Sequence, residues 1–342
     1  MTDKDKWDRF LDKLGSAFSA FFISRADSVY SRKADMLISK HNSSVQNLKM
    51  NTCLFIFLAF LAFGSSDKLL KKRPFGNICS PGCFCESLYS VQCQNGQLDD
   101  VPNNLSPALK RLDLQMNRLV QVSSIINSYG KLQFLRLNGN KIGAINSKNF
   151  DRLNELIDLE IANNRISELP DEAFAGLFKL RNLDLSNNQI ERLNSRIFRS
   201  TRNLQVLNLA HNKLDDLPRD VFENTALQEL NLKSNFFKEI PSDAFTTTPH
   251  LSILNFQDND ISSLSGSPFK NLGKLTSLNL NGCHITGLNG HSVNGLDSLR
   301  QLNIGQNQIS QFPTDAFRSL EHLEELEIGL NYITELNSKG KV

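Results

Sequence analysis

The chain has 342 residues and a formal net charge of +2 at pH 7, and 40% of its residues are hydrophobic. The apolar fraction is far above that of a disordered protein, and the balanced charge gives no reason to expect nucleic acid or an anionic membrane as a partner. Phenylalanine is abundant, at 23 residues, whereas tyrosine occurs four times and tryptophan once. This skew predicts one buried aromatic position that recurs along the chain.

Residues 1–49 form a polar segment of mixed charge that precedes the first long apolar run. Apolar side chains recur in it at three- and four-residue steps from Trp7 to Phe22, which is the pattern of one helix face. Such a helix would suit a membrane surface or a partner. We favour the alternative that these residues are an N-terminal extension outside the fold, because a secretion signal belongs at an N-terminus and one follows.

Residues 53–63, "CLFIFLAFLAF", form an uncharged apolar run of eleven. A membrane-spanning helix needs about 20 such residues, whereas the core of a signal peptide needs about 7 to 15. We therefore predict a signal peptide over 50–66. Basic residues from Lys68 to Arg73 follow the run, so a signal anchor is the alternative. Both interpretations place the rest of the chain, beginning with a linker at 67–78, outside the cytosol.

Four cysteines follow in "CSPGCFCESLYSVQC", at Cys79, Cys83, Cys85 and Cys93. Structural zinc sites use paired ligands two to four residues apart, and the single residue between the second and third cysteines makes a poor chelate. With a secretion signal upstream, oxidation is favoured. Spacing alone leaves three pairings open. We predict a cysteine-rich cap with two disulfides over 79–107.

The pattern L-x-x-L-x-L-x-x-N-x-[IL] then recurs ten times, from Leu109 onward, at steps of 23 or 24 residues. This is the leucine-rich-repeat pattern. Its L-x-L stretch alternates like a strand with one buried face, and the asparagine marks the turn that follows. We predict an α/β leucine-rich-repeat solenoid, a horseshoe with a parallel concave sheet, over 108–336. The sheet is disulfide-capped at its N-terminal end, and 337–342 form an uncapped C-terminal end.

Two columns of side chains should run along the coil. The asparagines predict a buried ladder at Asn117, Asn140, Asn164, Asn188, Asn212, Asn235, Asn259, Asn307 and Asn331. Ten residues later come Phe150, Phe174, Phe198, Phe222, Phe245, Phe269 and Phe317, which predict a stacked column of rings. Cys283 takes a ladder position, so we interpret it as an inert buried thiol. A nucleophile with His284 as its base is the alternative. With no cap after the last repeat, Leu326, Ile328, Ile333 and Leu336 should be exposed on one side.

The chain resembles the extracellular leucine-rich-repeat proteins with an N-terminal cysteine cap, such as Slit, Toll-type receptors, chaoptin and LRIG-like proteins. The cysteine cluster, "VPNNLSPALKRLDL" after it and segments such as "LPDEAFAGL" carry the resemblance, over residues 79–336. In caps of this family the first cysteine pairs with the third and the second with the fourth. The resemblance therefore implies Cys79–Cys85 and Cys83–Cys93, and a non-catalytic recognition protein that binds other proteins on its concave sheet.

The alternation of the strands indicates which residues face outward on that sheet. Phe134 has no reason to face water, and Arg136 is placed beside Glu160 and Asp184. Aromatic and arginine side chains are enriched in binding hot spots. We therefore predict a partner-binding patch of Phe134, Arg136, Asp158, Glu160 and Asp184. In later strands, five asparagines between 208 and 303 occupy the position that Arg136, Glu160 and Asp184 have in theirs. We interpret these asparagines as a solvated polar face.

These features predict a receptor ectodomain or a secreted adhesion or signalling protein that binds an extracellular or cell-surface protein. A structural matrix component that self-associates is the alternative. No catalytic or phosphate-binding motif is present, so we expect no enzyme activity, cofactor, metal, small-molecule substrate or nucleic acid. Asn104 begins a glycosylation sequon in the cap.

Overall fold

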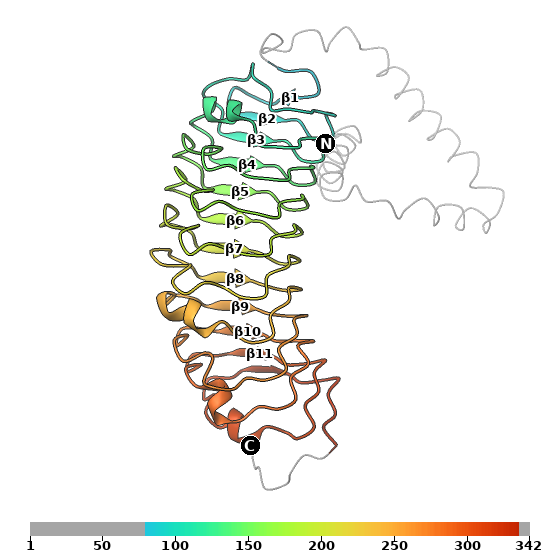
Figure 1. Cartoon of the computed structure of the whole chain (residues 1–342), viewed down its shortest axis with the longest axis vertical. Helices are drawn as coiled ribbons and strands as arrows, with labels where there is room; N and C mark the ends of the chain where they lie inside the picture. The colour runs from blue at the N-terminus through green and yellow to red at the C-terminus, as the bar shows by residue number, and fades with distance from the viewer. Residues whose placement is uncertain (1–78, 335–342) are drawn as a thin grey trace, which may run out of the picture. The chain divides into compact units, whose positions relative to one another are not determined.

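The computed structural model describes residues 79–334. They form a solenoid with one 12-stranded sheet, whose strands lie side by side in chain order (Figure 1). The predicted N-terminal extension (1–49), signal segment (50–66) and linker (67–78) lie outside the described residues, as does the predicted end at 337–342. Within 79–334, no helix has both the length and the apolar character needed to cross a membrane.

The sheet has ten parallel repeat strands, as predicted, and a small antiparallel pair in the cap. β1 (Phe84–Cys85) pairs antiparallel with β2 (Ser90–Gln92), and β2 pairs in parallel with β3. The repeat strands, each of three residues, are β3 (Arg111–Asp113), β4 (Phe134–Arg136), β5 (Asp158–Glu160), β6 (Asn182–Asp184), β7 (Val206–Asn208), β8 (Glu229–Asn231), β9 (Ile253–Asn255), β10 (Ser277–Asn279), β11 (Gln301–Asn303) and β12 (Glu325–Glu327).

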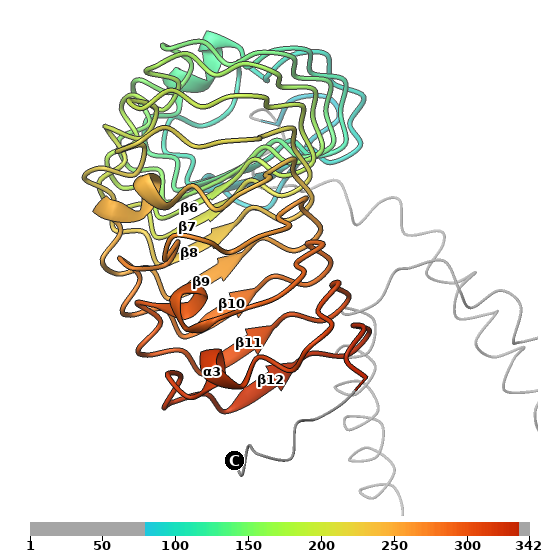
Figure 2. The ribbon, with the colours of Figure 1, turned by 60° about the horizontal axis from the view of Figure 1, so that its bottom comes forward.

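Most outer turns return to the next strand without regular structure. The exceptions are the 3-10 helices η2 (Ser124–Ser128), η3 (Ser242–Thr247) and η4 (Gly290–Val293) and the short helix α3 (Thr314–Phe317). Figure 2 shows the coils stacked on one another with their strands in one continuous row. Stacking of this kind lets each repeat bury the apolar layer of its neighbour.

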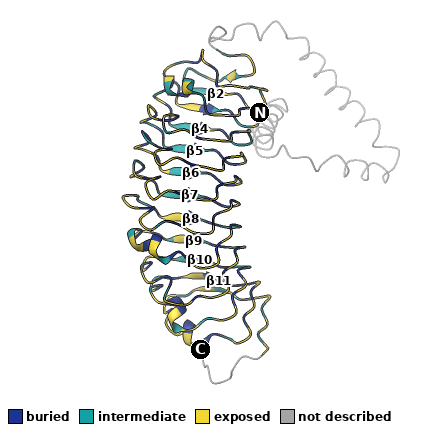
Figure 3. Cartoon of the chain, in the orientation of Figure 1, coloured by how far each residue is buried: buried dark blue, intermediate teal, exposed yellow. Residues whose placement is uncertain are grey.

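The core lies inside the coil, behind the strands (Figure 3). In β3–β11 the middle residue of each strand is a buried leucine, and the residues on either side of it are exposed or half-buried. In β12 the corresponding Leu326 is only half-buried, as are Ile328 and Ile333. The last described repeat therefore leaves its apolar layer partly open, as predicted; Leu336 lies outside the described residues.

The asparagine ladder is present and joins each repeat to the one before it, except where Cys283 replaces the asparagine. Asn140 shows the arrangement: its Nδ2 donates to the carbonyls of Leu114 (2.9 Å) and Leu137 (2.9 Å), and its Oδ1 accepts the N–H of Leu119 (3.1 Å). All nine asparagines make this set of bonds, and eight of them are buried. Each side chain therefore satisfies backbone groups of two repeats that the turn leaves unpaired.

Cys283 is a ladder position with fewer bonds. The thiol is fully buried and donates to the Phe256 carbonyl (3.2 Å). The sulfur does not replace the amide oxygen that accepts the corresponding N–H elsewhere in the ladder, and the buried N–H of Ile261 has no hydrogen-bond acceptor within the described residues. Burial raises the pKa of the Cys283 thiol to about 11, and the Asp258 carboxylate adds to this. The thiol therefore stays protonated at neutral pH, as predicted for an inert residue.

The phenylalanine column is also present. Phe150, Phe174, Phe198, Phe222, Phe245 and Phe269 are at most 1% exposed, and Phe317 is half-buried. The rings of Phe174 and Phe198 stack with their centroids 6.0 Å apart, and those of Phe198 and Phe222 stack at 6.1 Å. Seven of the ten repeats place a ring on the outer side of the core, and Val293 takes this position in the repeat of Cys283.

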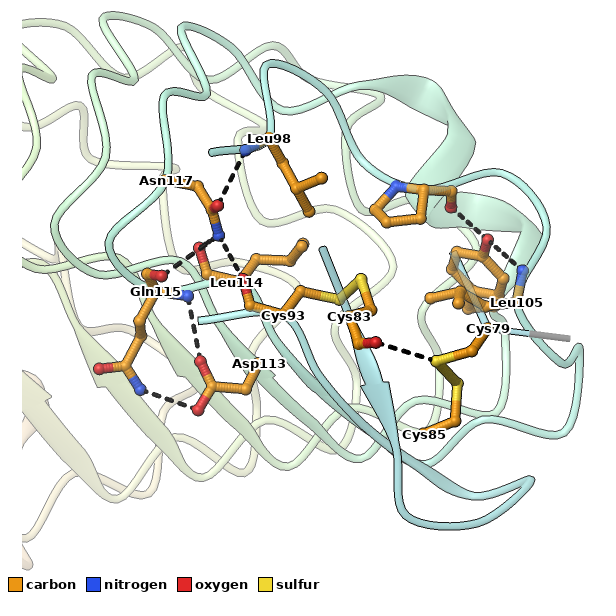
Figure 4. Close-up of a disulfide and its surroundings, with 12 residues drawn as sticks. Cys79, Cys83, Cys85, Cys93, Leu98, Leu105, Asp113, Leu114, Gln115 and Asn117 are labelled. Atoms are coloured by element: carbon orange, nitrogen blue, oxygen red, sulfur yellow. Dashed lines mark hydrogen bonds between the residues drawn. A yellow bond between two sulfur atoms is a disulfide. The ribbon is translucent and has the colours of Figure 1, made fainter. Parts of the chain in front are cut away.

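The cap contains both implied disulfides, Cys79–Cys85 and Cys83–Cys93 (Figure 4). Its backbone also begins the ladder, because the Cys93 carbonyl accepts Nδ2 of Asn117 (2.8 Å). Cys93 thus takes the place of the third leucine of a repeat, which is Leu114 in the repeat that follows. The cap covers the first apolar layer and is continuous with the sheet, since the Cys93 N–H donates to the Asp113 carbonyl (2.7 Å).

Replacing Phe222 by alanine should lower the free energy of unfolding by about 3–5 kcal/mol, because it removes a ring stacked in the middle of the column and leaves a cavity. The matched control is Phe178→Ala, since the Phe178 side chain is 53% exposed and its loss should change stability little. Denaturant unfolding of the full chain measures both. Equal effects of the two substitutions would contradict a buried column.

Replacing Cys283 by asparagine should raise the free energy of unfolding by about 1 kcal/mol, because the amide would give the Ile261 N–H its acceptor. Thermal unfolding at constant pH measures the change. Cys283→Ala is the control: it removes the thiol without restoring the bonds, and it should lower the melting temperature. If the Cys283→Asn variant melts below the wild type, the missing acceptor of the Ile261 N–H does not limit the stability of the protein.

Candidate functional site

The five residues of the predicted patch lie on three adjacent strands and face the same side of the sheet. Phe134 is paired in register with Asp158, and Arg136 with Glu160, which is paired in turn with Asp184. The leucines between them point into the core. The structure therefore brings all five side chains together on the concave face, as the alternation predicted. Whether they bind a partner stays a prediction.

Arg136 is held between two carboxylates. Its Nε lies 3.1 Å from Oε1 of Glu160 on β5, and its Nη1 lies 4.0 Å from Oδ2 of Asp113 on β3. Oε2 of Glu160 also accepts Nδ2 of Asn138 (2.7 Å). The Arg136 side chain is still 46% exposed, so these ion pairs contribute little to stability. They fix the guanidinium in one orientation and leave part of it free for a partner.

Phe134 is half-buried and carries a cation on its ring. The guanidinium carbon of Arg111, the residue paired with it on β3, lies 4.2 Å from the ring centroid. This contact between cation and ring accounts for an aromatic residue on the concave face. Sequence reasoning left Arg111 and Asp113 out of the patch, although both occupy the same two columns one repeat earlier.

The carboxylates of β5, β6 and β8 are less compensated. Asp158 accepts Nδ2 of Asn182 (3.1 Å), and Asp184 accepts the N–H of Ser186 (2.9 Å). In the described part of the chain, Asp158, Asp184 and Glu229 make no ion pair. Across β3–β12, the first and third strand residues include two arginines and seven carboxylates. The concave face is therefore acidic, although the chain as a whole is nearly neutral.

The five asparagines of the concave column have a structural role that the sequence did not reveal. In Asn208, Asn231, Asn255, Asn279 and Asn303, Oδ1 accepts the backbone N–H two residues later, at 2.9–3.2 Å. Each side chain thus closes the bend after its strand. The interpretation as a solvated polar face was incomplete, because one end of each amide is bound to backbone and only the Nδ2 group is available to solvent or neighbours.

Cys283 and His284 do not form a catalytic pair. The thiol is buried and its pKa is raised, whereas His284 is exposed, has a positive φ of 64° and contacts Nε2 of Gln308 (3.4 Å). Successive residues in this turn point to opposite sides, so the imidazole cannot act as a base for the sulfur. Among residues 79–334, no cluster of His, Cys, Asp and Glu is suited to hold a metal ion.

The predicted glycosylation residue lies on the cap. Asn104 is exposed, whereas the next residue, Leu105, is buried. The hydroxyl of Tyr129 donates to the Pro102 carbonyl and accepts the Leu105 N–H (3.4 Å), which ties this loop to the first repeat. Burial raises the pKa of the Tyr129 hydroxyl. The side chain of Asn104 is accessible to a glycan, and its modification stays a prediction.

The chain is similar in sequence or in structure to several known proteins. Amphoterin-induced protein 2 of Homo sapiens and of Pongo abelii is 36% identical over 87 residues, which is 25% of this chain and only 16% of the length of either relative. An internalin of Listeria monocytogenes superposes with a TM-score of 0.60 at 25% identity, covering 73% of this chain and 70% of the internalin. The TLR13 chain of a TLR13–single-stranded RNA complex superposes with a TM-score of 0.55 at 26% identity, covering 72% and 43%.

The family assignment rests on the repeats themselves. The leucine rich repeat family model matches four overlapping segments, at 130–190, 178–235, 225–285 and 274–333, which together span more than half of the chain. These segments hold strands β4–β12, eight of the nine ladder asparagines and the whole ring column described above. The chain therefore belongs to the leucine-rich-repeat family, whose fold is a scaffold for protein interaction and is not typically catalytic.

Proposed function

We propose that this protein is a non-catalytic extracellular recognition protein that binds a protein partner on the concave face of its solenoid. It would act as a receptor ectodomain or as a secreted adhesion or signalling protein. The observation that carries the proposal is the patch around Phe134 and Arg136, which places an aromatic ring and a positioned guanidinium on an open sheet. Leucine-rich-repeat solenoids are typical of protein-binding receptor ectodomains.

Disulfide chemistry supports an extracellular or cell-surface location. Both pairs of cap cysteines are oxidised, and disulfides persist in secreted and extracellular proteins but are rare in the cytosol. The apolar run at 53–63 would direct the chain into the secretory pathway as a signal peptide or anchor. A glycan on the exposed Asn104 is consistent with that route.

A protein partner fits the concave face better than a nucleic acid does. One similar solved structure, that of TLR13, is a complex with single-stranded RNA. Affinity for nucleic acid comes mostly from lysine and arginine contacts to phosphates. On this chain the strand residues of the concave face carry two arginines against seven carboxylates, which repels a polyanion. The same surface favours a protein with basic side chains through charge complementarity.

Two substitutions in the patch should each weaken partner binding at least tenfold without unfolding the protein. Phe134→Ser removes the aromatic surface, and Arg136→Glu places a carboxylate beside Asp113 and Glu160. The partner would come from a screen of the secreted full chain against cell-surface ectodomains, and surface plasmon resonance would measure affinity. Phe178→Ser is the control, because Phe178 is 53% exposed and lies outside the strands. Full binding by both patch variants would place the site elsewhere.

A structural matrix protein that self-associates is the second candidate, favoured by the last described repeat. There Leu330 is 78% exposed and Tyr332 is 68% exposed, beside the half-buried Leu326 and Ile328. Self-association through this layer predicts a molar mass that rises with concentration in light scattering after gel filtration. Leu330→Ser should then restore a monomer. A wild-type monomer at all concentrations would exclude this candidate and leave the recognition function.

A further inference from the structure

The most exposed aromatic side chain of the cap lies on the same face of the sheet as the patch. Phe84 on β1 is opposite Gln92 on β2, which is in register with Asp113 on β3 and hence with Arg136 on β4. Directly paired residues of a sheet point to the same face. The Phe84 side chain is 56% exposed, so the core does not use it.

The backbone of Phe84 is cross-linked on both sides. It lies between Cys83 and Cys85, and each of these cysteines belongs to a different disulfide. The hairpin that follows is fixed as well, because the Glu86 carboxylate accepts Ser90 Oγ (2.7 Å) and Gln92 Nε2 (2.6 Å). A rigid aromatic residue loses little conformational entropy when a partner covers it.

The half of the concave face toward the cap therefore has two chemically different parts. The part next to the cap carries the rings of Phe84 and Phe134, and its two arginines, Arg111 and Arg136, balance the carboxylates of Asp113 and Glu160. The following part, toward β8, carries Asp158, Asp184 and Glu229, which have no cationic partner among the described residues. From the cap toward β8, the surface is thus first aromatic and then acidic.

We propose that the partner surface extends onto the disulfide cap, with Phe84 as an anchor, and that it receives a basic polypeptide segment with apolar side chains at one end. The apolar end packs on Phe84 and Phe134, and the basic side chains face Asp158, Asp184 and Glu229. The inference rests on the proposed function of the concave face. β1 to β8 span seven strand spacings, roughly 34 Å, which an extended segment of about ten residues covers.

The test uses random-sequence peptides displayed on phage and selected on the secreted full chain. The peptides that are enriched should be basic and contain a large apolar residue. Phe84→Ser should weaken their binding about tenfold, mainly through faster dissociation. Asp184→Asn should instead slow association and reduce its dependence on salt. Phe178→Ser, which removes an equally exposed phenylalanine outside the strands, should change neither rate.

The outcomes separate this inference from the function on which it rests. Peptides that lose affinity with Phe134→Ser and Arg136→Glu but bind the Phe84→Ser variant fully would overturn the extension and leave the concave site in place. Selected peptides without a basic bias would overturn the proposed chemistry of the segment. Peptides that bind all these variants equally, or no enrichment over beads without protein, would overturn both proposals.

Discussion

One shared carbonyl group per repeat connects the whole solenoid. The Leu137 carbonyl, for example, accepts the amide of its own repeat, Asn140, and the amide of the next, Asn164. A carbonyl oxygen has two lone pairs and a side-chain amide has two N–H groups. Each carbonyl can therefore accept two asparagines, and each asparagine can donate to two carbonyls, along the whole coil. Because this exchange works only when the asparagines stack in register, it requires nearly constant repeat length, and steps of 23 or 24 residues result. The strands, the core and the concave surface all inherit that register.

Because of the same register, different residues of each strand provide stability and face a partner. In each repeat strand the middle leucine packs in the core, and the residues before and after it face outward. A change from Phe134 on β4 to Asp158 on β5 alters the surface and leaves the buried leucines unchanged. The concave face can thus combine rings near the cap, carboxylates on β5–β8 and asparagines toward β11 on one uniform framework. Function in this protein depends on which side chains occupy positions that the fold leaves open.

The spacing of residues in the sequence predicts the structural features that all repeats share, because every repeat must stack on its neighbours in the same way. It gave the strands, the ladder, the ring column and the position of Cys283, and it placed all five patch residues on one face. Spacing could not show that Arg111 covers the ring of Phe134 or that Arg136 lies between Asp113 and Glu160. Those contacts join residues 23 or 24 positions apart and depend on side-chain rotamers. The bends closed by the concave asparagines were missed for a different reason. Polar residues are expected at exposed positions anyway, so asparagines there gave no sign of a structural role.

The N–H of Ile261, which has no acceptor in the part of the chain that the structure describes, affects how the array behaves as a chain of coupled units. Repeat proteins are stabilised by each repeat and by its interface with the next, so cooperativity passes from neighbour to neighbour. The interface before Cys283 lacks one bond that the other ladder interfaces have. Opening fluctuations concentrate where coupling is weakest, so we expect amide hydrogen exchange to be faster around β9 and β10 than in the stacked-ring region of Phe174 to Phe222. A weak interface at this place would divide the solenoid into two cooperative blocks, and the proposed binding surface lies in the block next to the disulfide cap.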